Sequence, residues 1–212
     1  RLNRPLDFLV IADHALNMGV LAAAEARDPR VFGTENGEHA VTWLNKLKES
    51  DPVKLSQVQA EVELEFAVTS VGDEKFRRSL WKDVTALADQ YNDPGHFTAL
   101  IGYEWTSVAY NLHRVVIFQD GADKVGSIIP FSQFDSPDPE KLWSFLDSYT
   151  RETGGDVLAI PHNGNLSRGT MFALEDANGN PFSKHYAKTR SRWEPLYEVT
   201  QIKGDSEAHR FL

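Results

Sequence analysis

The apolar positions of the chain fall into two patterns, short continuous runs and stripes with a spacing of three or four residues. Continuous apolar runs between polar segments are typical of strands that are buried on both faces, as in a parallel sheet. We predict strands of this kind at Leu6–Ala12, Phe97–Tyr103, His113–Phe118, Asp156–Ile160 and Leu196–Ile202.

Stripes at helical spacing predict two amphipathic helices between these strands. The first covers Glu74–Tyr91, and Asp73 is placed to cap its start. The second covers Pro139–Thr150, with Asp138 as the cap and the proline in the first turn. Strands that alternate with helices indicate an α/β fold with a largely parallel sheet.

The segment from residue 19 to residue 71 interrupts this alternation between the first and second strands. Helices are predicted in it over Ala40–Leu47 and Leu55–Phe66. A long insertion often covers a functional site as a lid or wall, and structural padding is an equal alternative. We expect residues 1–212 to form a single domain that carries this helical insertion.

Composition narrows the class of protein. Apolar residues make up 41% and charged residues 25% of the chain, as in soluble globular proteins. No apolar run approaches the roughly 20 residues of a membrane span, and a net charge of −9 argues against a nucleic-acid binder. The chain has no cysteine, so a metal must be held by His, Asp or Glu. The cytoplasm and the periplasm stay equally open as compartments.

Residues of metal-binding type directly follow three of the predicted strands. Asp13 and His14 follow the first strand, Glu104 the second and His162 the fourth. Because the carboxyl ends of parallel strands open on one face, these side chains are expected to meet there. Imidazole and carboxylate groups suit zinc, manganese or iron. We therefore predict His14, Glu104 and His162 as metal ligands, with Asp13 orienting a ligand from outside.

The next candidates lie beside these residues or farther along the chain. His113 begins the third strand nine residues after Glu104, and a tight return between them would make it a further ligand. Arg114 and Lys203 are candidate cations for an anionic substrate, and Asn163 is a candidate substrate contact. For each of these residues a purely structural role is the alternative. A histidine beside a strand, for example, is often a hydrogen-bonded core residue.

Longer motifs surround these residues, namely PLDFLVIADHA, FTALIGYEWTS followed by NLHRVVIF, GGDVLAIPHNGNLS and RWEPLYEVTQIKGDSEAH. With them the chain resembles a bacterial branch of the PHP (polymerase and histidinol phosphatase) superfamily, the domain of unknown function 3604. The resemblance runs across almost the whole chain. It implies a distorted (β/α)7 TIM-like barrel with two or three divalent ions, zinc, manganese or iron, at the carboxyl ends of the strands.

The same resemblance implies roles for single residues. It makes His14, Glu104, His113 and His162 the metal ligands, with Glu104 bridging ions. Relatives hydrolyse phosphate esters with a metal-activated water, so the resemblance implies a phosphoesterase for a small anionic substrate. Glu104, His162 and Asp13 would then be its catalytic residues. Hydrolysis of a sulfate ester or an amide is one alternative, and a non-catalytic binding or scaffold role is another.

Two motifs of the superfamily have no match in this chain. An early His-x-His pair is missing, and the segment Gly204–His209 has the wrong spacing for the late Asp-x-His pair. We therefore expect the chain to be an internal portion of a longer domain and to hold metal more weakly than the complete domain. Glu207 and His209 are further site candidates.

Overall fold

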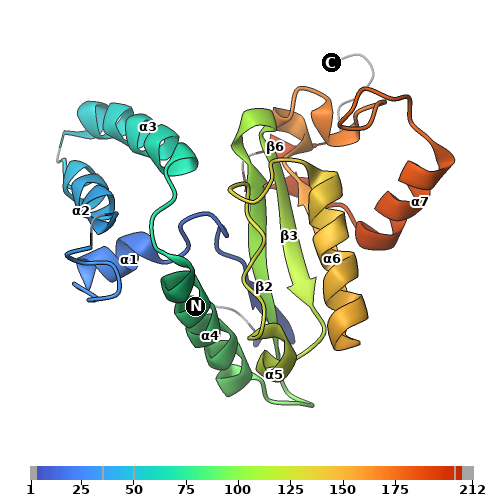
Figure 1. The fold of residues 1–212 in the computed structure, drawn as a ribbon, viewed down its shortest axis with the longest axis horizontal. Coiled ribbons are helices and arrows are strands. Elements are labelled where there is room, and N and C mark those ends of the chain that lie inside the picture. The colour runs from blue at the N-terminus through green and yellow to red at the C-terminus, as the bar shows by residue number, and fades with distance from the viewer. Residues whose placement is uncertain (1–3, 35, 50, 203, 207–212) are drawn as a thin grey trace. The chain divides into compact units, whose positions relative to one another are not determined.

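The computed structural model describes residues 4–34, 36–49, 51–202 and 204–206, which form a mixed α/β structure (Figure 1). The chain divides into two compact units. One unit contains the chain up to Ala15 together with the part from Val84 onward, and the other runs from Leu16 to Asp83. The main sheet belongs to the first unit, and the second unit is helical.

The main sheet has the strand order β1-β2-β3-β4. Its strands are β1 at Phe8–Ile11, β2 at Thr98–Ser107, β3 at Leu112–Phe118 and β4 at Val157–His162. β1 pairs with β2 in parallel, whereas β2 with β3 and β3 with β4 are antiparallel. The sheet is open, so the predicted (β/α)7 barrel is wrong, and so is the prediction of a largely parallel sheet.

The antiparallel pairing follows from the link between β2 and β3. The 3-10 turn Val108–Tyr110 and Asn111, which has a φ of 50°, make this link. A parallel connection needs a crossover of about a dozen residues or more. The link is far too short for that, and β3 therefore returns directly alongside β2.

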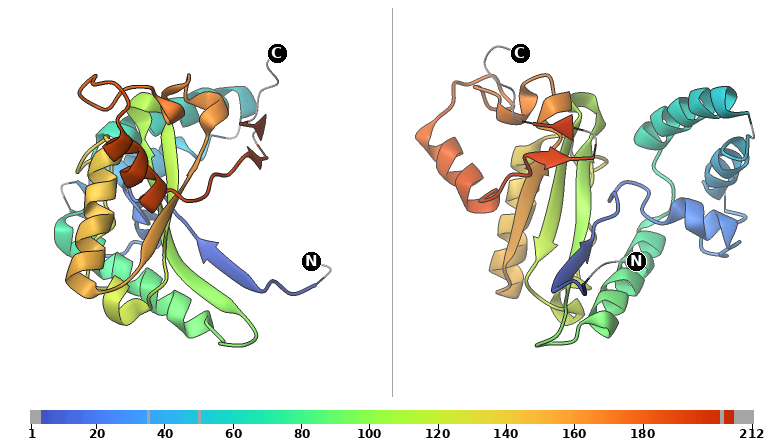
Figure 2. Two further views of the ribbon diagram at one scale, coloured as in Figure 1. Left: turned by 90° about the vertical axis from the view of Figure 1, so that its right-hand side faces the viewer. Right: turned by 180° about the vertical axis from the view of Figure 1, so that it is seen from behind.

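The helix α6 covers one face of this sheet (Figure 2). Successive side chains of a strand point to opposite faces, so every second residue of β3 is buried on this side. At its far end the ring of Phe118 meets that of Tyr149 on α6, with 4.9 Å between the ring centroids. His113 points to the opposite face, which is only half-buried along β3.

Both predicted amphipathic helices are confirmed. α4 covers Glu74–Tyr91, and the Asp73 carboxylate accepts the Phe76 N–H at 2.7 Å. α6 covers Pro139–Thr153, and the Asp138 carboxylate accepts a backbone N–H of its first turn at 2.8 Å. The other helices of the sheet unit are α5 at Ala122–Val125, α7 at Lys184–Trp193 and the 3-10 turns Gly164–Leu166 and Thr170–Phe172.

Two of the strand predictions need correction. Only Thr200–Gln201 of the predicted strand Leu196–Ile202 is a strand, β5, and it pairs with β6 at Gly204–Asp205 instead of joining the main sheet. Its apolar residues are not sheet core, because Leu196 is exposed. β1 is an edge strand and carries exposed apolar side chains, so it is not buried on both faces.

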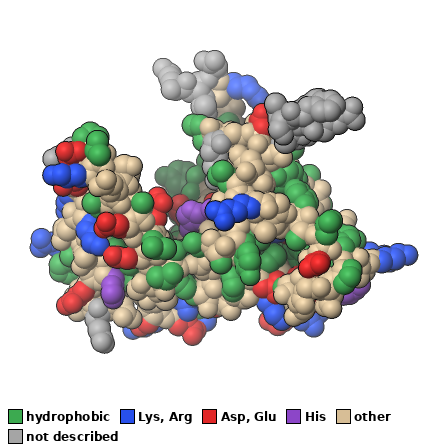
Figure 3. Space-filling view, turned by 90° about the horizontal axis from the view of Figure 1, so that it is seen from above, with side chains coloured by type: hydrophobic (Ala, Val, Ile, Leu, Met, Phe, Trp, Pro, Cys, Tyr) green, Lys and Arg blue, Asp and Glu red, His purple; other side chains and the backbone are tan. Residues whose placement is uncertain are grey.

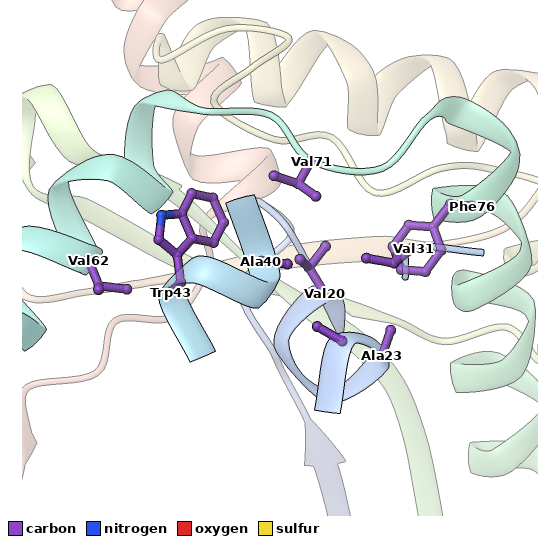
Figure 4. Packing of buried hydrophobic residues seen from close by; sticks show 9 residues of the cluster. Val20, Ala23, Val31, Ala40, Trp43, Val62, Val71 and Phe76 are labelled. Carbon is purple, nitrogen blue, oxygen red and sulfur yellow. The ribbon is translucent and has the colours of Figure 1, made fainter. Parts of the chain in front are cut away.

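The helical unit contains α1 at Val20–Glu25, α2 at Gly37–Lys46, α3 at Pro52–Val68 and the first part of α4. Its core is an apolar cluster around the fully buried Trp43 (Figure 4). The Trp43 indole N–H donates to the Glu65 carboxylate at 2.8 Å. The buried Asn17 amide donates to two backbone carbonyls at 2.8 Å and accepts the Val71 N–H at 2.7 Å. No helix among the described residues is long and apolar enough to cross a membrane.

Candidate metal centre

The four predicted ligands meet at one end of the main sheet. His14 continues the register of β1 and forms a parallel bridge with Glu104 on β2. Thr106 of β2 lies opposite His113 of β3, and His113 lies opposite His162 of β4. β1, β2 and β4 all end at this edge, and β3 begins there, so the register brings these residues onto adjacent strands. Histidine surface is visible on the face of the molecule shown in Figure 3.

The three imidazoles converge on one carboxylate oxygen, Glu104 Oε1. His14 Nδ1 lies 3.4 Å from it, His162 Nε2 lies 3.5 Å from it, and His113 Nδ1 is in direct hydrogen-bond contact. Ligand atoms of His14, Glu104 and His113 all lie within 4.8 Å of one another. His162 falls outside that group of three, although its ring centroid is only 5.5 Å from that of His113.

These separations can be compared with those of ligands on one ion. Two donors bound to zinc at about 2.1 Å in tetrahedral geometry lie roughly 3.4 Å apart. The distances from Glu104 to His14 and His162 are close to this value. The His113–Glu104 pair is closer and would have to separate to a similar distance around an ion.

The surroundings of Glu104 and His113 favour the protonation states in which these two side chains bind metals. Burial by itself would raise the pKa of Glu104, but hydrogen bonds from His113 and His162 and the charges of nearby histidines lower it well below its usual range. Burial lowers the pKa of His113, although contact with Glu104 acts in the opposite direction. At neutral pH the site therefore favours an ionised carboxylate and a neutral imidazole, which are the protonation states that bind metals.

Thr106 is a site residue that the sequence reading missed. Its hydroxyl oxygen lies 2.7 Å from His14 Nδ1, and its hydroxyl donates to Glu104 Oε1 at 3.3 Å. The strand period could have found it, because residues i and i+2 of a strand share a face. Asn111 was also missed, and its side chain contacts the distal nitrogen of His113 at 3.2 Å.

The other predicted site residues are not gathered at this cluster. Asp13 joins it through the backbone, since its carbonyl accepts the Glu104 N–H at 2.8 Å, while its side chain is exposed and lines an apolar groove beside β1. Arg114 points to the opposite face of β3 and forms a buried ion pair with Glu194. Asn163 is buried next to His162 and donates to Asn111. Lys203, Glu207 and His209 lie outside the described residues.

The fold and the cluster define a mixed α/β protein with a histidine–carboxylate centre at the end of a four-stranded sheet. Over residues 1–212 the chain matches the family described as "Protein of unknown function (DUF3604)", and it belongs to that family. No curated protein and no solved structure matches it. The family description states no reaction, so function has to be argued from the site.

Proposed function

We propose that this chain carries the metal centre of a divalent-metal-dependent hydrolase that acts on a phosphate ester. The observation that carries the proposal is the convergence of His14, His113 and His162 on Glu104 Oε1. The likeness of the surrounding motifs to those of the PHP superfamily supports the same chemistry.

The donor set fits such an ion. Three imidazoles and one carboxylate suit zinc, manganese or iron, and their spacing is close to that of ligands on one ion. Among the described residues no Lys or Arg forms an ion pair with Glu104, and the ionisable side chains that contact this half-buried carboxylate are histidines. The chemistry that a bound divalent ion supplies is Lewis acidity at the ester and a water of lowered pKa.

The histidines of the centre differ in solvent exposure, and their roles in this proposal follow from that difference. The side chain of His14 is 50% exposed, whereas that of His162 is 6% exposed. Substrate would therefore approach from the side of His14, with His113 and His162 holding the inner side of the site. Thr106 orients both His14 and Glu104 through its hydroxyl.

Arg114 does not serve as a substrate cation in this proposal. Its guanidinium is buried on the other face of β3 and is paired with Glu194. Recognition of an anionic ester at this centre would accordingly depend on the charge of the bound ion and on the exposed histidine.

The proposal is tested by metal titration of the chain with Zn²⁺ and Mn²⁺, combined with hydrolysis of a generic aryl phosphate. Glu104→Gln removes the carboxylate on which all three histidines converge, and should weaken metal binding by more than about 100-fold, beyond the range for residues behind the ligands. His162→Ala should weaken binding as well. The matched control is His96→Gln, because His96 is exposed and its ion-pair partner among the described residues is the exposed Asp93.

The outcomes separate the candidate functions. Metal binding and metal-dependent hydrolysis that are both lost in Glu104→Gln and kept in His96→Gln would support the hydrolase. Metal binding without hydrolysis of phosphate, sulfate or amide substrates would favour a non-catalytic scaffold. A chain that binds neither metal at millimolar concentration would contradict the proposal.

A further inference from the structure

Asn111 lies immediately behind His113, on the side away from Glu104. We propose that Asn111 is a positioning residue that favours the tautomer of His113 in which Nδ1 presents its lone pair to a metal ion. This inference rests on the proposed function.

The orientation of the Asn111 amide is fixed by its other contacts. Its Nδ2 donates to the Leu166 carbonyl at 3.1 Å, and a carbonyl can only accept. The Oδ1 atom therefore faces His113, and it also accepts from Asn163 Nδ2 at 3.2 Å. A flipped amide would set its NH₂ group against that of Asn163 and its oxygen against the Leu166 oxygen.

With the amide fixed, the distal nitrogen of His113 faces an acceptor. His113 Nε2 lies 3.2 Å from Asn111 Oδ1, so a proton on Nε2 is hydrogen-bonded there. Glu104 competes for that proton, because its carboxylate contacts Nδ1 of the same ring. The Asn111 amide favours the tautomer that leaves Nδ1 without a proton, and only that tautomer can bind metal through Nδ1.

The two asparagines of this arrangement both have positive φ angles. Asn111 has a φ of 50° and Asn163 a φ of 77°, in the left-handed region that Asn tolerates better than most residues. Asn163 is 1% exposed and directly follows His162, so one pair of amides connects the turn before β3 with the end of β4. Metal-binding histidines commonly donate their other ring N–H to an acceptor of this kind.

Glycine gives a clean test, because it adopts positive φ without strain. Asn111→Gly removes the acceptor and keeps the turn, whereas Asn111→Asp keeps an acceptor oxygen. The matched control is Arg27→Gly, which makes the same change at an exposed residue with a φ of 53° in the helical unit. Zn²⁺ affinity is measured by competition with a chelator. The tautomer of His113 is read from long-range ¹H–¹⁵N spectra of the metal-free chain, with His113→Gln to assign its signals.

We expect the parent and Asn111→Asp to show a larger share of the Nε2–H tautomer than Asn111→Gly, which should shift toward Nδ1–H. We also expect Asn111→Gly to weaken Zn²⁺ binding by about 10–100-fold, and Arg27→Gly to leave it unchanged. An unchanged tautomer in Asn111→Gly, or equal losses of affinity in Asn111→Gly and Asn111→Asp, would overturn the inference. If the parent bound no Zn²⁺, the proposed function would fail, and the spectra of the metal-free chain would still decide the role of Asn111.

Discussion

Glu194 forms a buried charge network on the face of the sheet opposite the histidine–Glu104 cluster. Its carboxylate is 1% exposed and accepts hydrogen bonds from Arg114 Nε at 2.5 Å, Trp143 Nε1 at 2.7 Å and Arg190 Nε at 3.0 Å. Glu194→Gln removes the negative charge and one acceptor oxygen. The Arg114 side chain, 2% exposed, would then stay buried without its counter-charge.

The expected cost follows from that unpaired charge. Removing one partner of a buried ion pair typically lowers the free energy of unfolding by about 3–5 kcal/mol, because the remaining charge is desolvated and uncompensated. Replacing a complete buried ion triad by apolar residues is often close to neutral. A variant with Met in place of Arg114, Arg190 and Glu194 should therefore be more stable than Glu194→Gln alone.

Urea unfolding followed by circular dichroism measures these differences. With a slope of about 2 kcal/mol/M, Glu194→Gln should lower the urea midpoint by roughly 2 M. The control is Asp147→Asn, which breaks the exposed pair between Asp147 and Arg151 and should cost less than about 1 kcal/mol. Glu194→Gln that costs no more than the control would refute the reasoning, and so would a triple methionine variant less stable than Glu194→Gln.

Two further predictions concern the metal-free sheet unit. His113 and Glu104 both have lowered pKa values in the folded chain, so each contributes stability above its ordinary pKa that is lost as the pH falls. With a chelator present, the urea midpoint should decrease as the pH drops below about 6.5, and decrease again as it drops below about 4.5. His113→Gln should remove the first decrease. A parent midpoint that stays flat from pH 7 to 5 would contradict this prediction. Gly102→Ala would place a Cβ 2.6 Å from both the Val116 carbonyl oxygen and Val10 Cγ2, and should cost about 1–3 kcal/mol in the same assay. Gly121→Ala, whose Cβ would have its nearest contacts at 3.4 Å, is the control and should change the midpoint little; equal midpoints in the two variants would show that the strands move apart without cost.

The residues of the histidine–Glu104 cluster could be picked out from the sequence because strand ends are local features. An apolar run followed at once by His14, Glu104 or His162 marks a side chain at the end of a strand. His113 was a candidate on the condition that the short link from Glu104 makes a tight return, and the structure places His113 beside Glu104. The caps at Asp73 and Asp138 are also local, and both are where the sequence placed them.

The direction of β3 relative to its neighbours was predicted wrongly, because an apolar run shows that a strand is buried but does not identify its partner. The same short link argues for antiparallel pairing of β2 and β3, and that argument outweighs the apolar pattern that suggested a parallel sheet. Alternation along β3 likewise places Arg114 on the opposite face from His113. The partner of Arg114, Glu194, lies 80 residues away along the chain, and no local pattern connects the two.

β3 therefore joins two charged sites that cannot share their residues. His113 faces the carboxylate of Glu104, and its neighbour Arg114 faces that of Glu194, because successive side chains point to opposite sides of the sheet. Arg114 could contact a ligand at the histidine cluster only if β3 shifted its register by one residue, which would also carry His113 away from Glu104. The negative charge of an anionic ligand at the cluster must then be neutralised by a bound cation or by residues beyond this strand. This is the physical reason for testing metal content before substrates.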